Sequence, residues 1–298
     1  MSLTGRVAIV TGAGGGLGRA HAHFLAAKGA KVVVNDLSAE AARKVADEIE
    51  SAGGTASAFA ASVTDEAAIA DMVSTTIATY GRVDIIVNNA GILRDKSFGK
   101  MSVDDFRSVV EVHLMGSVIC TKAVWPIMRE QQFGRIVMTT SSSGLYGNFG
   151  QSNYGAAKMA LVGLMQTLAI EGEKHNIRVN CLAPTAATGM TQGILPDLSL
   201  RLLAPERVSP GLFALVSDDA PTRAILCAGA GHFASANITL TEGVQIGDRP
   251  DAAEEVIRHW PDISDRSGEI VPDYGFVQAE REVASASSPT PLKAVAGE

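Results

Sequence analysis

Short apolar runs alternate along this chain with longer segments whose apolar residues recur at helical spacing. The run at residues 7–10 is rich in β-branched side chains, whereas segments 67–80 and 106–128 carry apolar residues three and four positions apart. This alternation is typical of strand–helix–strand units with parallel strands buried on both faces. Further strands are predicted at residues 31–35, 56–60, 84–87, 135–138, 178–182 and 224–227. The pattern predicts an α/β fold with one doubly wound parallel sheet of about seven strands and helices on both faces.

The alternation stops after residue 227, which divides the chain into three expected parts. Residues 1–235 are predicted to form the α/β domain. Residues 236–283 are predicted to form a C-terminal extension that packs on this domain or on a partner subunit, with a short strand or arm at 238–246 and one helix at 250–262. Residues 284–298 are small, polar and contain proline, so we expect a disordered tail.

The composition of the chain argues against nucleic acid and membranes as partners. The chain has 298 residues, 46% hydrophobic and 19% charged, which suffices for a large core. Its net charge of −7 and the lack of a basic stripe argue against nucleic acid. No apolar run approaches the roughly 20 residues of a membrane helix, and neither end carries a recognised targeting signal. We therefore expect no membrane association and a cytoplasmic location.

The cysteines Cys120, Cys181 and Cys227 lie in apolar runs at unrelated spacings. This arrangement indicates buried reduced thiols and supports neither a disulfide framework nor a metal site.

A hydroxyl, a phenol and an ammonium are expected to converge near the middle of the chain. Tyr154 and Lys158 are four residues apart in a helical pattern, so they share one helix face. Ser141 follows the strand at 135–138, at the edge where open parallel sheets hold their ligands. These residue types form a proton-transfer set, although a helix-surface pair and a turn hydroxyl would give the same pattern.

A glycine-rich turn follows the first predicted strand. The sequence TGAGGGLG at residues 11–18 fits GxxxGxG, with Gly12, Gly16 and Gly18 in frame. Glycines permit close approach of the backbone to a pyrophosphate, which the following helix N-terminus would also attract. Asp36 ends the second predicted strand, where a carboxylate accepts adenosine ribose hydroxyls and repels a 2′-phosphate. The pattern predicts NAD in preference to NADP.

Together these motifs, with Asn88-Asn89-Ala90-Gly91, resemble those of the short-chain dehydrogenases/reductases over about residues 4–232. Longer strings, including NNAGILRDKSF and LAIEGEKHNIRVN, are similar to the (3R)-hydroxyacyl-CoA dehydrogenase units of peroxisomal multifunctional enzymes of type 2, which are also called 17β-hydroxysteroid dehydrogenases type 4. The resemblance implies a Rossmann-type fold, hydride transfer and a homodimer or homotetramer. The oligomer would form through the helices at 106–128 and 152–174, although their apolar faces could equally be core.

The resemblance also implies which residues hold the cofactor. It assigns Gly12, Gly16, Leu17 and Gly18 to the pyrophosphate, Asp36 to the adenosine ribose, Ser62 and Val63 to the adenine, Asn89 and Tyr154 to positions beside the cofactor, Lys158 to the nicotinamide ribose, and Thr185, Ala186 and Thr188 to the nicotinamide. Two positions depart from the family pattern. Ser62 stands where an aspartate is usual, and Thr185 stands where a glycine follows the proline.

Tyr154 is the expected acid/base, and Ser141 would orient the substrate oxygen. A phenol ionises near pH 10, and positive charge on Lys158 and on the nicotinamide is expected to lower that pKa. His113 stands where the family usually has an asparagine that relays protons to the lysine. A histidine can also donate and accept, so His113 is either a catalytic relay or a core histidine.

The resulting hypothesis is NAD-dependent oxidation of (3R)-hydroxyacyl-CoA to 3-oxoacyl-CoA. Arg94, Lys96 and Lys100 could meet an acyl-CoA thioester, or could be solvated loop residues, and segment 188–205 is rich in apolar residues and could form a lid. The main alternative is a 17β-hydroxysteroid dehydrogenase acting on steroid or sterol-derived substrates. A 3-oxoacyl carrier-protein reductase is a weaker alternative, because Asp36 disfavours NADPH. A non-catalytic dinucleotide sensor is also weaker, because Ser141, Tyr154 and Lys158 are all present.

Overall fold

The structure, a computed structural model, describes residues 1–187 and 201–287. The chain forms two compact units, Met1–Ala236 and Asn237–Glu298. Thr188 lies outside the described residues, as do residues 288–298 of the expected tail.

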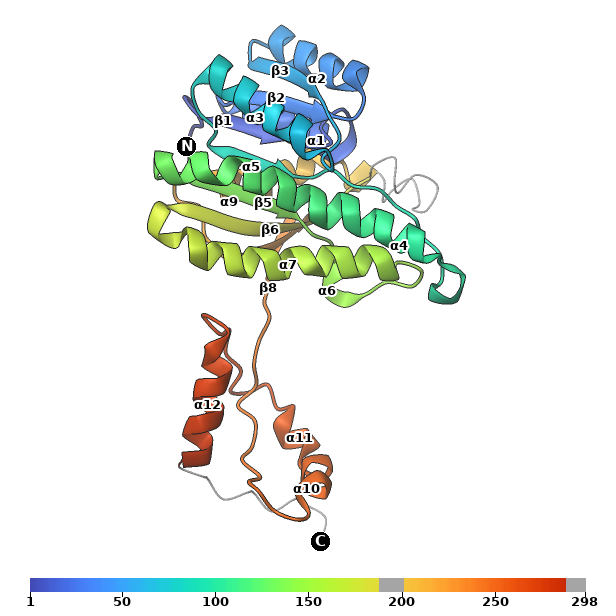
Figure 1. Ribbon diagram of the computed structural model, residues 1–298, viewed down its shortest axis with the longest axis vertical. Coiled ribbons are helices and arrows are strands. Elements are labelled where there is room, and N and C mark those ends of the chain that lie inside the picture. Colours follow the sequence, from blue (N-terminus) through green and yellow to red (C-terminus); the bar gives the residue numbers. More distant parts are fainter. Residues whose placement is uncertain (188–200, 288–298) are drawn as a thin grey trace. The chain divides into compact units, whose positions relative to one another are not determined.

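The first unit is built on an eight-stranded sheet with strand order β3-β2-β1-β4-β5-β6-β7-β8 (Figure 1). Its strands are β1 (Val7–Val10), β2 (Lys31–Asp36), β3 (Thr55–Ala60), β4 (Ile85–Asn88), β5 (Gly134–Thr139), β6 (Ile177–Thr185), β7 (Ile225–Gly229) and β8 (His232–Ala236). The strands from β1 to β7 run parallel. The order reverses between β1 and β4, and such a switch point is where open α/β sheets bind ligands. The doubly wound sheet is confirmed.

Helices cover both faces of this sheet. On one face α1 (Gly16–Ala27), α2 (Ala39–Ser51) and α9 (Ser209–Val216) bury aliphatic side chains, including Leu25, Ile49 and Leu212. On the other face α3 (Glu66–Tyr80), α5 (Gly116–Gln131) and α7 (Ser152–Gly172) contribute a second core. Because each parallel strand is buried on both sides, its sequence is a continuous apolar run and does not alternate.

The sheet has an eighth strand, β8, which the sequence pattern does not predict. It pairs antiparallel with β7 across the two-residue turn Ala230–Gly231, where both residues have positive φ. Positive φ at both central positions is the geometry of a type I′ hairpin turn. A glycine meets this requirement easily, but an alanine gives little local signal for it, so the sequence pattern ended the sheet one strand early.

The helix predicted at 106–128 is three consecutive segments. An α-helix, α4 (Val103–Val110), leads into a π-helical turn, η2 (Glu111–Met115), and then into α5. A π-helical turn inserts an extra residue into the helix and often marks a functional site. Here it carries His113.

Side-chain caps start two of the predicted helices. The Ser38 hydroxyl accepts the Ala41 N–H at the start of α2, and the Ser102 hydroxyl accepts the Asp105 N–H at the start of α4. Each bond satisfies a helix N–H that has no partner within the helix. The Asp105 carboxylate also pairs with Lys96 at 2.9 Å.

The second unit contains α10 (Ala252–Arg258), α11 (Trp260–Ile263) and α12 (Phe276–Ser287). The single helix expected at 250–262 is thus divided at His259, directly before the Trp260-Pro261 pair; proline restricts the backbone of the residue before it. The expected strand at 238–246 is reduced to one bridge between Leu240 and Ile270. Helix α12 extends through residues 284–287, so the prediction of a disordered tail from residue 284 is wrong for these four residues. Among the described residues, no helix has the length and apolarity needed to span a membrane.

Candidate active site

Ser141 lies where the central sheet meets the longest helix. Strand β5 ends at Thr139, and Ser141 is the N-cap of the short helix α6 (Ser142–Tyr146). Its hydroxyl accepts the Ser143 N–H at 3.2 Å, which fixes the side chain at the carboxyl end of the sheet. Ser141 is 8% exposed, so its oxygen is shielded without being sealed from a ligand.

Tyr154 and Lys158 occupy the first two turns of α7 and face Ser141. The Ser141 hydroxyl lies near enough to the Tyr154 phenol to lower its pKa. The Lys158 ammonium is 5.5 Å from the centroid of the Tyr154 ring and donates to the Thr139 carbonyl at 2.5 Å. The structure therefore brings together the three side chains expected to form a proton-transfer set. Thr139 was not identified from the sequence, because its contribution is a backbone carbonyl.

Burial dominates the ionisation of this set. It raises the pKa of Tyr154, which the neighbouring Ser141 hydroxyl lowers and the Asp95 charge raises further. Burial also lowers the pKa of Lys158 to about 7. The net direction for the protein without cofactor is therefore upward, and the lowering expected from Lys158 together with the nicotinamide stays a prediction. A low-dielectric environment disfavours phenolate and ammonium alike.

His113 forms a wall of the same site. Its ring stands edge-on to the Tyr154 ring, with 5.2 Å between centroids and an interplanar angle of 90°. Its Nε2 lies 2.8 Å from the Ile92 carbonyl, and burial lowers its pKa to about 3, so the imidazole is neutral. Its Nδ1 is buried with no hydrogen-bond partner among the described residues. A Cβ at Gly91 would overlap the imidazole, so only glycine fits there.

The glycine turn between β1 and α1 is tightly packed on one side and open on the other. Gly12 and Gly16 have positive φ, and a Cβ at Gly18 would overlap the Gly12 carbonyl. A Cβ at Gly15 would meet nothing within 4 Å, and no side chain caps the N-terminus of α1 there. Open space beside uncapped N–H groups suits a pyrophosphate. The Leu17 side chain is in the core, which leaves only its backbone for a cofactor.

Asp36 is held against this turn by backbone donors. One carboxylate oxygen accepts the Gly14 N–H at 2.9 Å and the other accepts the Ser38 N–H at 3.0 Å. A Cβ at Gly14 would lie 2.8 Å from the carboxylate. Gly14 was outside the predicted motif, although it is the residue that lets the turn approach Asp36. The fixed carboxylate at the end of β2 can accept two ribose hydroxyls.

Asn89 binds the glycine turn directly. Its side-chain amide donates to the Thr11 carbonyl at 2.9 Å and to the Gly12 carbonyl at 3.2 Å. The Thr11 hydroxyl in turn accepts the N–H groups of Asn89 and Ala90. Thr11 was missed by sequence reasoning, although its place directly before Gly12 was a usable signal. This bracing joins the ends of β1 and β4 at the switch point.

The remaining expected cofactor contacts lie around the same sheet edge. Ser62 follows β3, where its hydroxyl is 2.8 Å from that of Thr64, and Val63 is buried against Gly116 of α5. Thr185 ends β6 and Ala186 follows it. Within the described ranges no group of three or more His, Cys, Asp or Glu could hold a metal. Of the free cysteines, Cys120 and Cys181 are buried as expected, whereas Cys227 is only half-buried.

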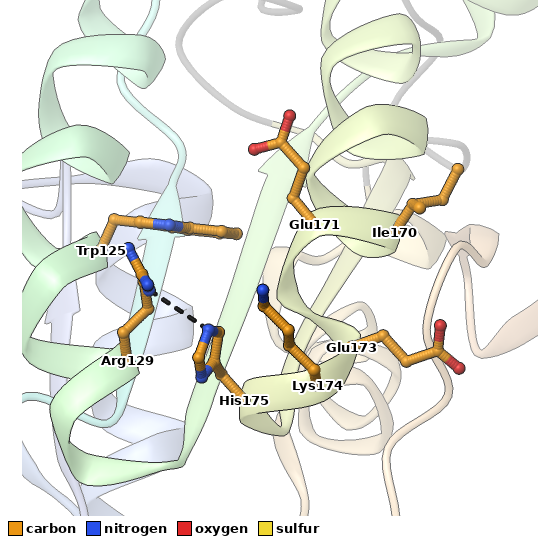
Figure 2. A pocket seen from close by; sticks show the side chains of 7 residues that line it. All are labelled: Trp125, Arg129, Ile170, Glu171, Glu173, Lys174 and His175. Atoms are coloured by element: carbon orange, nitrogen blue, oxygen red, sulfur yellow. Dashed lines mark hydrogen bonds between the residues drawn. The ribbon is translucent and has the colours of Figure 1, made fainter.

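Figure 2 shows a pocket of about 640 Å³ that is separate from this site. It is lined by Trp125, Arg129, Ile170, Glu171, Glu173, Lys174 and His175. Arg129 donates to His175 across it at 3.3 Å. The pocket lies at the C-terminal end of α7, whereas Tyr154 is in the first turn, roughly 27 Å away at 1.5 Å per residue. It takes no part in the catalytic set.

The fold, the glycine turn and the group of Ser141, Tyr154 and Lys158 together are typical of one class of protein. A family model described as short chain dehydrogenase matches residues 6–198, so the chain belongs to this family and is an oxidoreductase enzyme. It is 45% identical over 273 residues to a short-chain type dehydrogenase/reductase of Mycobacterium tuberculosis, with 88% of this chain and 95% of that protein covered. It is 46% identical over 276 residues to peroxisomal multifunctional enzyme type 2 of Drosophila melanogaster, with 88% and 46% covered.

Solved structures agree with these sequence matches. Full-length peroxisomal multifunctional enzyme type 2 from Drosophila melanogaster superposes with a TM-score of 0.81 at 38% identity, over 97% of this chain and 51% of that one. A 7α-hydroxysteroid dehydrogenase, complexed with NADH and 7-oxo glycochenodeoxycholic acid, gives a TM-score of 0.72 at 33% identity over 77% of this chain and 95% of that one. The chain thus spans about half the length of the multifunctional enzyme and nearly all of the mycobacterial relative.

Proposed function

We propose that this enzyme oxidises (3R)-hydroxyacyl-CoA to 3-oxoacyl-CoA with NAD, using Tyr154 as the acid/base. The observation that carries the proposal is the gathering of Ser141, Tyr154 and the buried Lys158 ammonium at the sheet edge that also bears the glycine turn. The similarity to peroxisomal multifunctional enzyme type 2 supports the choice of substrate.

The glycine turn fits the proposed cofactor. The open side at Gly15 and the uncapped start of α1 would receive the pyrophosphate, and the carboxylate of Asp36 would accept the adenosine ribose hydroxyls. Fixed negative charge at this place repels a 2′-phosphate, which favours NAD over NADP. When bound, the cofactor accepts the hydride.

The residues of the chain supply orientation and the proton step. The Ser141 hydroxyl binds the substrate oxygen, and Tyr154 removes its proton as the carbonyl forms. Lys158 binds the nicotinamide ribose and, when protonated, stabilises the phenolate. Neutral His113 has a buried Nδ1 with no hydrogen-bond partner among the described residues, and this nitrogen can hydrogen-bond a water molecule. This supports its role in a proton relay.

The rim carries cations suited to an acyl-CoA. Lys96 is paired with Asp105, but Arg94 and Lys100 are exposed. These two side chains are the proposed contacts for the phosphates of coenzyme A. Most of the expected lid, residues 188–200, lies outside the described residues.

A steroid alcohol is the second candidate substrate. The similarity to a 7α-hydroxysteroid dehydrogenase bound to a bile-acid derivative supports it. The same Ser141 and Tyr154 would act on a ring hydroxyl. The two candidate substrates would therefore react by the same chemistry, and only the walls of the substrate pocket would select between them.

Initial rates of NADH formation with (3R)- and (3S)-hydroxyacyl-CoA and with a 17β-hydroxysteroid test the proposal. We expect turnover of the (3R) thioester with NAD, and a loss of roughly 10³-fold or more in kcat for Tyr154→Phe with little change in NADH affinity. Asp36→Ala should weaken the preference for NAD over NADP. Turnover of the (3S) form alone would refute the stereochemistry, and full activity in Tyr154→Phe would refute the mechanism.

The cellular location remains the expectation of a cytoplasmic protein. The peroxisomal relatives make a peroxisome the alternative, and fractionation with a tagged full-length protein decides between them.

A further inference from the structure

Two loops beside the catalytic set, the loop after β4 and the loop between α6 and α7, are fastened to each other (Figure 1). The Lys96 N–H donates to the Gly150 carbonyl at 2.9 Å. The Gln151 amide donates to the Asp95 carboxylate at 2.6 Å. A Cβ at Gly150 would lie 3.8 Å from the carbonyl carbon of Lys96, so the two backbones are in contact. The two loops therefore present one continuous surface.

This surface exposes three large aromatic side chains. Phe98 belongs to the loop after β4, Tyr146 ends α6, and Phe149 belongs to the loop that follows. None of the three is less than 72% exposed. Single exposed apolar residues are ordinary, but several on joined loops mark a surface that meets a ligand or a partner. We call Phe98, Tyr146 and Phe149 the aromatic rim.

Cations border the aromatic rim. Arg94 and Lys100 are exposed on the loop after β4, and neither pairs with a carboxylate of the residues that the structure describes. Of the neighbouring carboxylates, Asp95 is bonded across to the other loop and Asp105 pairs with Lys96. Guanidinium and ammonium groups bind phosphates, and aromatic faces stack on nucleobases. Cations beside aromatic rings therefore suit a phosphorylated nucleotide.

The aromatic rim lies near the reacting groups but outside them. Helix α6 begins at the Ser141 N-cap and ends at Tyr146, five residues later, which is a rise of about 7.5 Å at 1.5 Å per residue. On the other loop, the Arg94 carbonyl accepts the side-chain amide of Asn153, the residue before Tyr154, at 3.1 Å. A ligand that reacts at Tyr154 would therefore meet the rim through a part remote from its reacting carbon.

We propose that the aromatic rim binds the adenosine end of coenzyme A, with Phe149 stacked on the adenine and Arg94 and Lys100 on the phosphates. In an acyl-CoA the pantetheine arm separates the thioester from the nucleotide, which matches a nucleotide site set apart from Tyr154. A steroid alcohol without an anionic group would leave both cations unused. This inference rests on the proposed function, and it selects the thioester over the steroid as the substrate class.

Calorimetric titration of coenzyme A into the full-length protein saturated with NADH tests this binding without turnover. NADH fills the dinucleotide site, so the adenosine of coenzyme A cannot bind there. Phe149→Ala should weaken coenzyme A binding roughly tenfold, because the stacking of one base on an aromatic ring contributes about that much. Phe149→Tyr keeps the aromatic face and should restore the wild-type affinity. NADH affinity should be the same in all three proteins.

The charge of the rim is tested with Lys100→Met. This variant should weaken coenzyme A binding about fivefold at low salt, and its difference from the wild type should shrink as salt is added, because exposed charges are screened. Lys44→Met is the matched control, because it removes an exposed lysine of α2 in another part of the domain. It should leave coenzyme A binding unchanged.

A truncated substrate gives a second readout. The (3R)-hydroxyacyl thioester of N-acetylcysteamine keeps the reacting group and lacks the nucleotide. The ratio of kcat/KM for the coenzyme A thioester to kcat/KM for the truncated thioester should fall about tenfold in Phe149→Ala, through a higher KM for the coenzyme A thioester.

Wild-type affinity for coenzyme A in Phe149→Ala and Lys100→Met would overturn the inference. A smaller mass of Phe149→Ala in sedimentation velocity, with unchanged coenzyme A affinity, would also overturn it and would make the aromatic rim a contact with a second copy of the chain. Failure of the proposed reaction would show separately, as coenzyme A that binds in a Phe149-dependent way while its hydroxyacyl thioesters are not turned over.

Discussion

Single residues in this enzyme owe their protonation to burial more than to neighbouring charge. His113 is 2% exposed and Lys158 is 3% exposed, and the pKa of each is lowered because the interior disfavours a cation. The same effect raises the pKa of Tyr154. An oxidised nicotinamide brings positive charge to this site, so cofactor binding is expected to make the phenol more acidic than it is in the protein alone.

His21 permits a test of this burial effect away from the site. It lies in α1, is fully buried, and its Nδ1 is 2.9 Å from the Ser209 hydroxyl of α9. Burial lowers its pKa from 6.5 to about 3. Between these values the unfolded chain binds a proton that the folded chain does not. The contribution of neutral His21 to the free energy of unfolding is therefore complete above pH 6.5 and is lost as pH falls toward 3.

We expect the free energy of unfolding of the wild type, measured with urea, to fall as pH is lowered through this window. His21 alone should contribute roughly 1.4 kcal/mol per pH unit in the middle of the window. His21→Asn should have a shallower slope by about that amount, with His113 accounting for part of the remainder. His232→Asn changes an exposed histidine on β8 and serves as the control. Identical slopes for wild type and His21→Asn would contradict the prediction.

At the scale of elements, the glycine turn must pack closely within the protein and must also leave room for a ligand. Different glycines meet these two requirements. Gly18 allows α1 to begin against the Gly12 carbonyl, so its role is in packing. Gly15 faces open space with an extended φ of −168° that any residue can adopt, so its role concerns only what approaches from outside. A motif read from the sequence cannot separate these roles, because both positions are simply glycine.

Alanine at each position separates them experimentally. Gly18→Ala should lower the melting temperature by several degrees and weaken NADH binding, because overpacking costs about 1–3 kcal/mol. Gly15→Ala should keep the wild-type melting temperature and weaken NADH binding roughly tenfold by obstructing the pyrophosphate. Thermal melts and NADH fluorescence titrations measure both. Wild-type NADH affinity in Gly15→Ala would place the pyrophosphate elsewhere.

At the scale of the whole molecule, α5 and α7 present outward surface beyond what the core uses. Ile170 on α7 is 47% exposed and lines the pocket of Figure 2 together with Trp125 of α5. The second unit also exposes large apolar side chains, including Trp260 and Phe276. These surfaces support the expectation of a homodimer or homotetramer, with α5 and α7 at the subunit contact.

Sedimentation velocity tests this expectation. We predict a dimer or tetramer for the wild type and a smaller species for Ile170→Glu, because a buried unpaired carboxylate destabilises an interface. Ala52→Glu, on exposed surface after α2, should keep the wild-type mass. A monomeric wild type would refute the oligomer, and an unchanged mass for Ile170→Glu would exclude this part of α7 from the interface.

The sequence by itself determined the succession of strands and helices, the glycine turn with Asp36, and the spacing that puts Tyr154 and Lys158 on one helix face. These features are local, because periodicity, caps and turn chemistry act over a few residues. Tertiary structure decided the antiparallel β8, the fit of His113 against Gly91, the hydrogen bonds of Gln151 with Asp95 and Ser143, and the upward direction of the Tyr154 pKa. Each of these depends on burial or on contacts between residues far apart in the chain, and neither is encoded within a single segment.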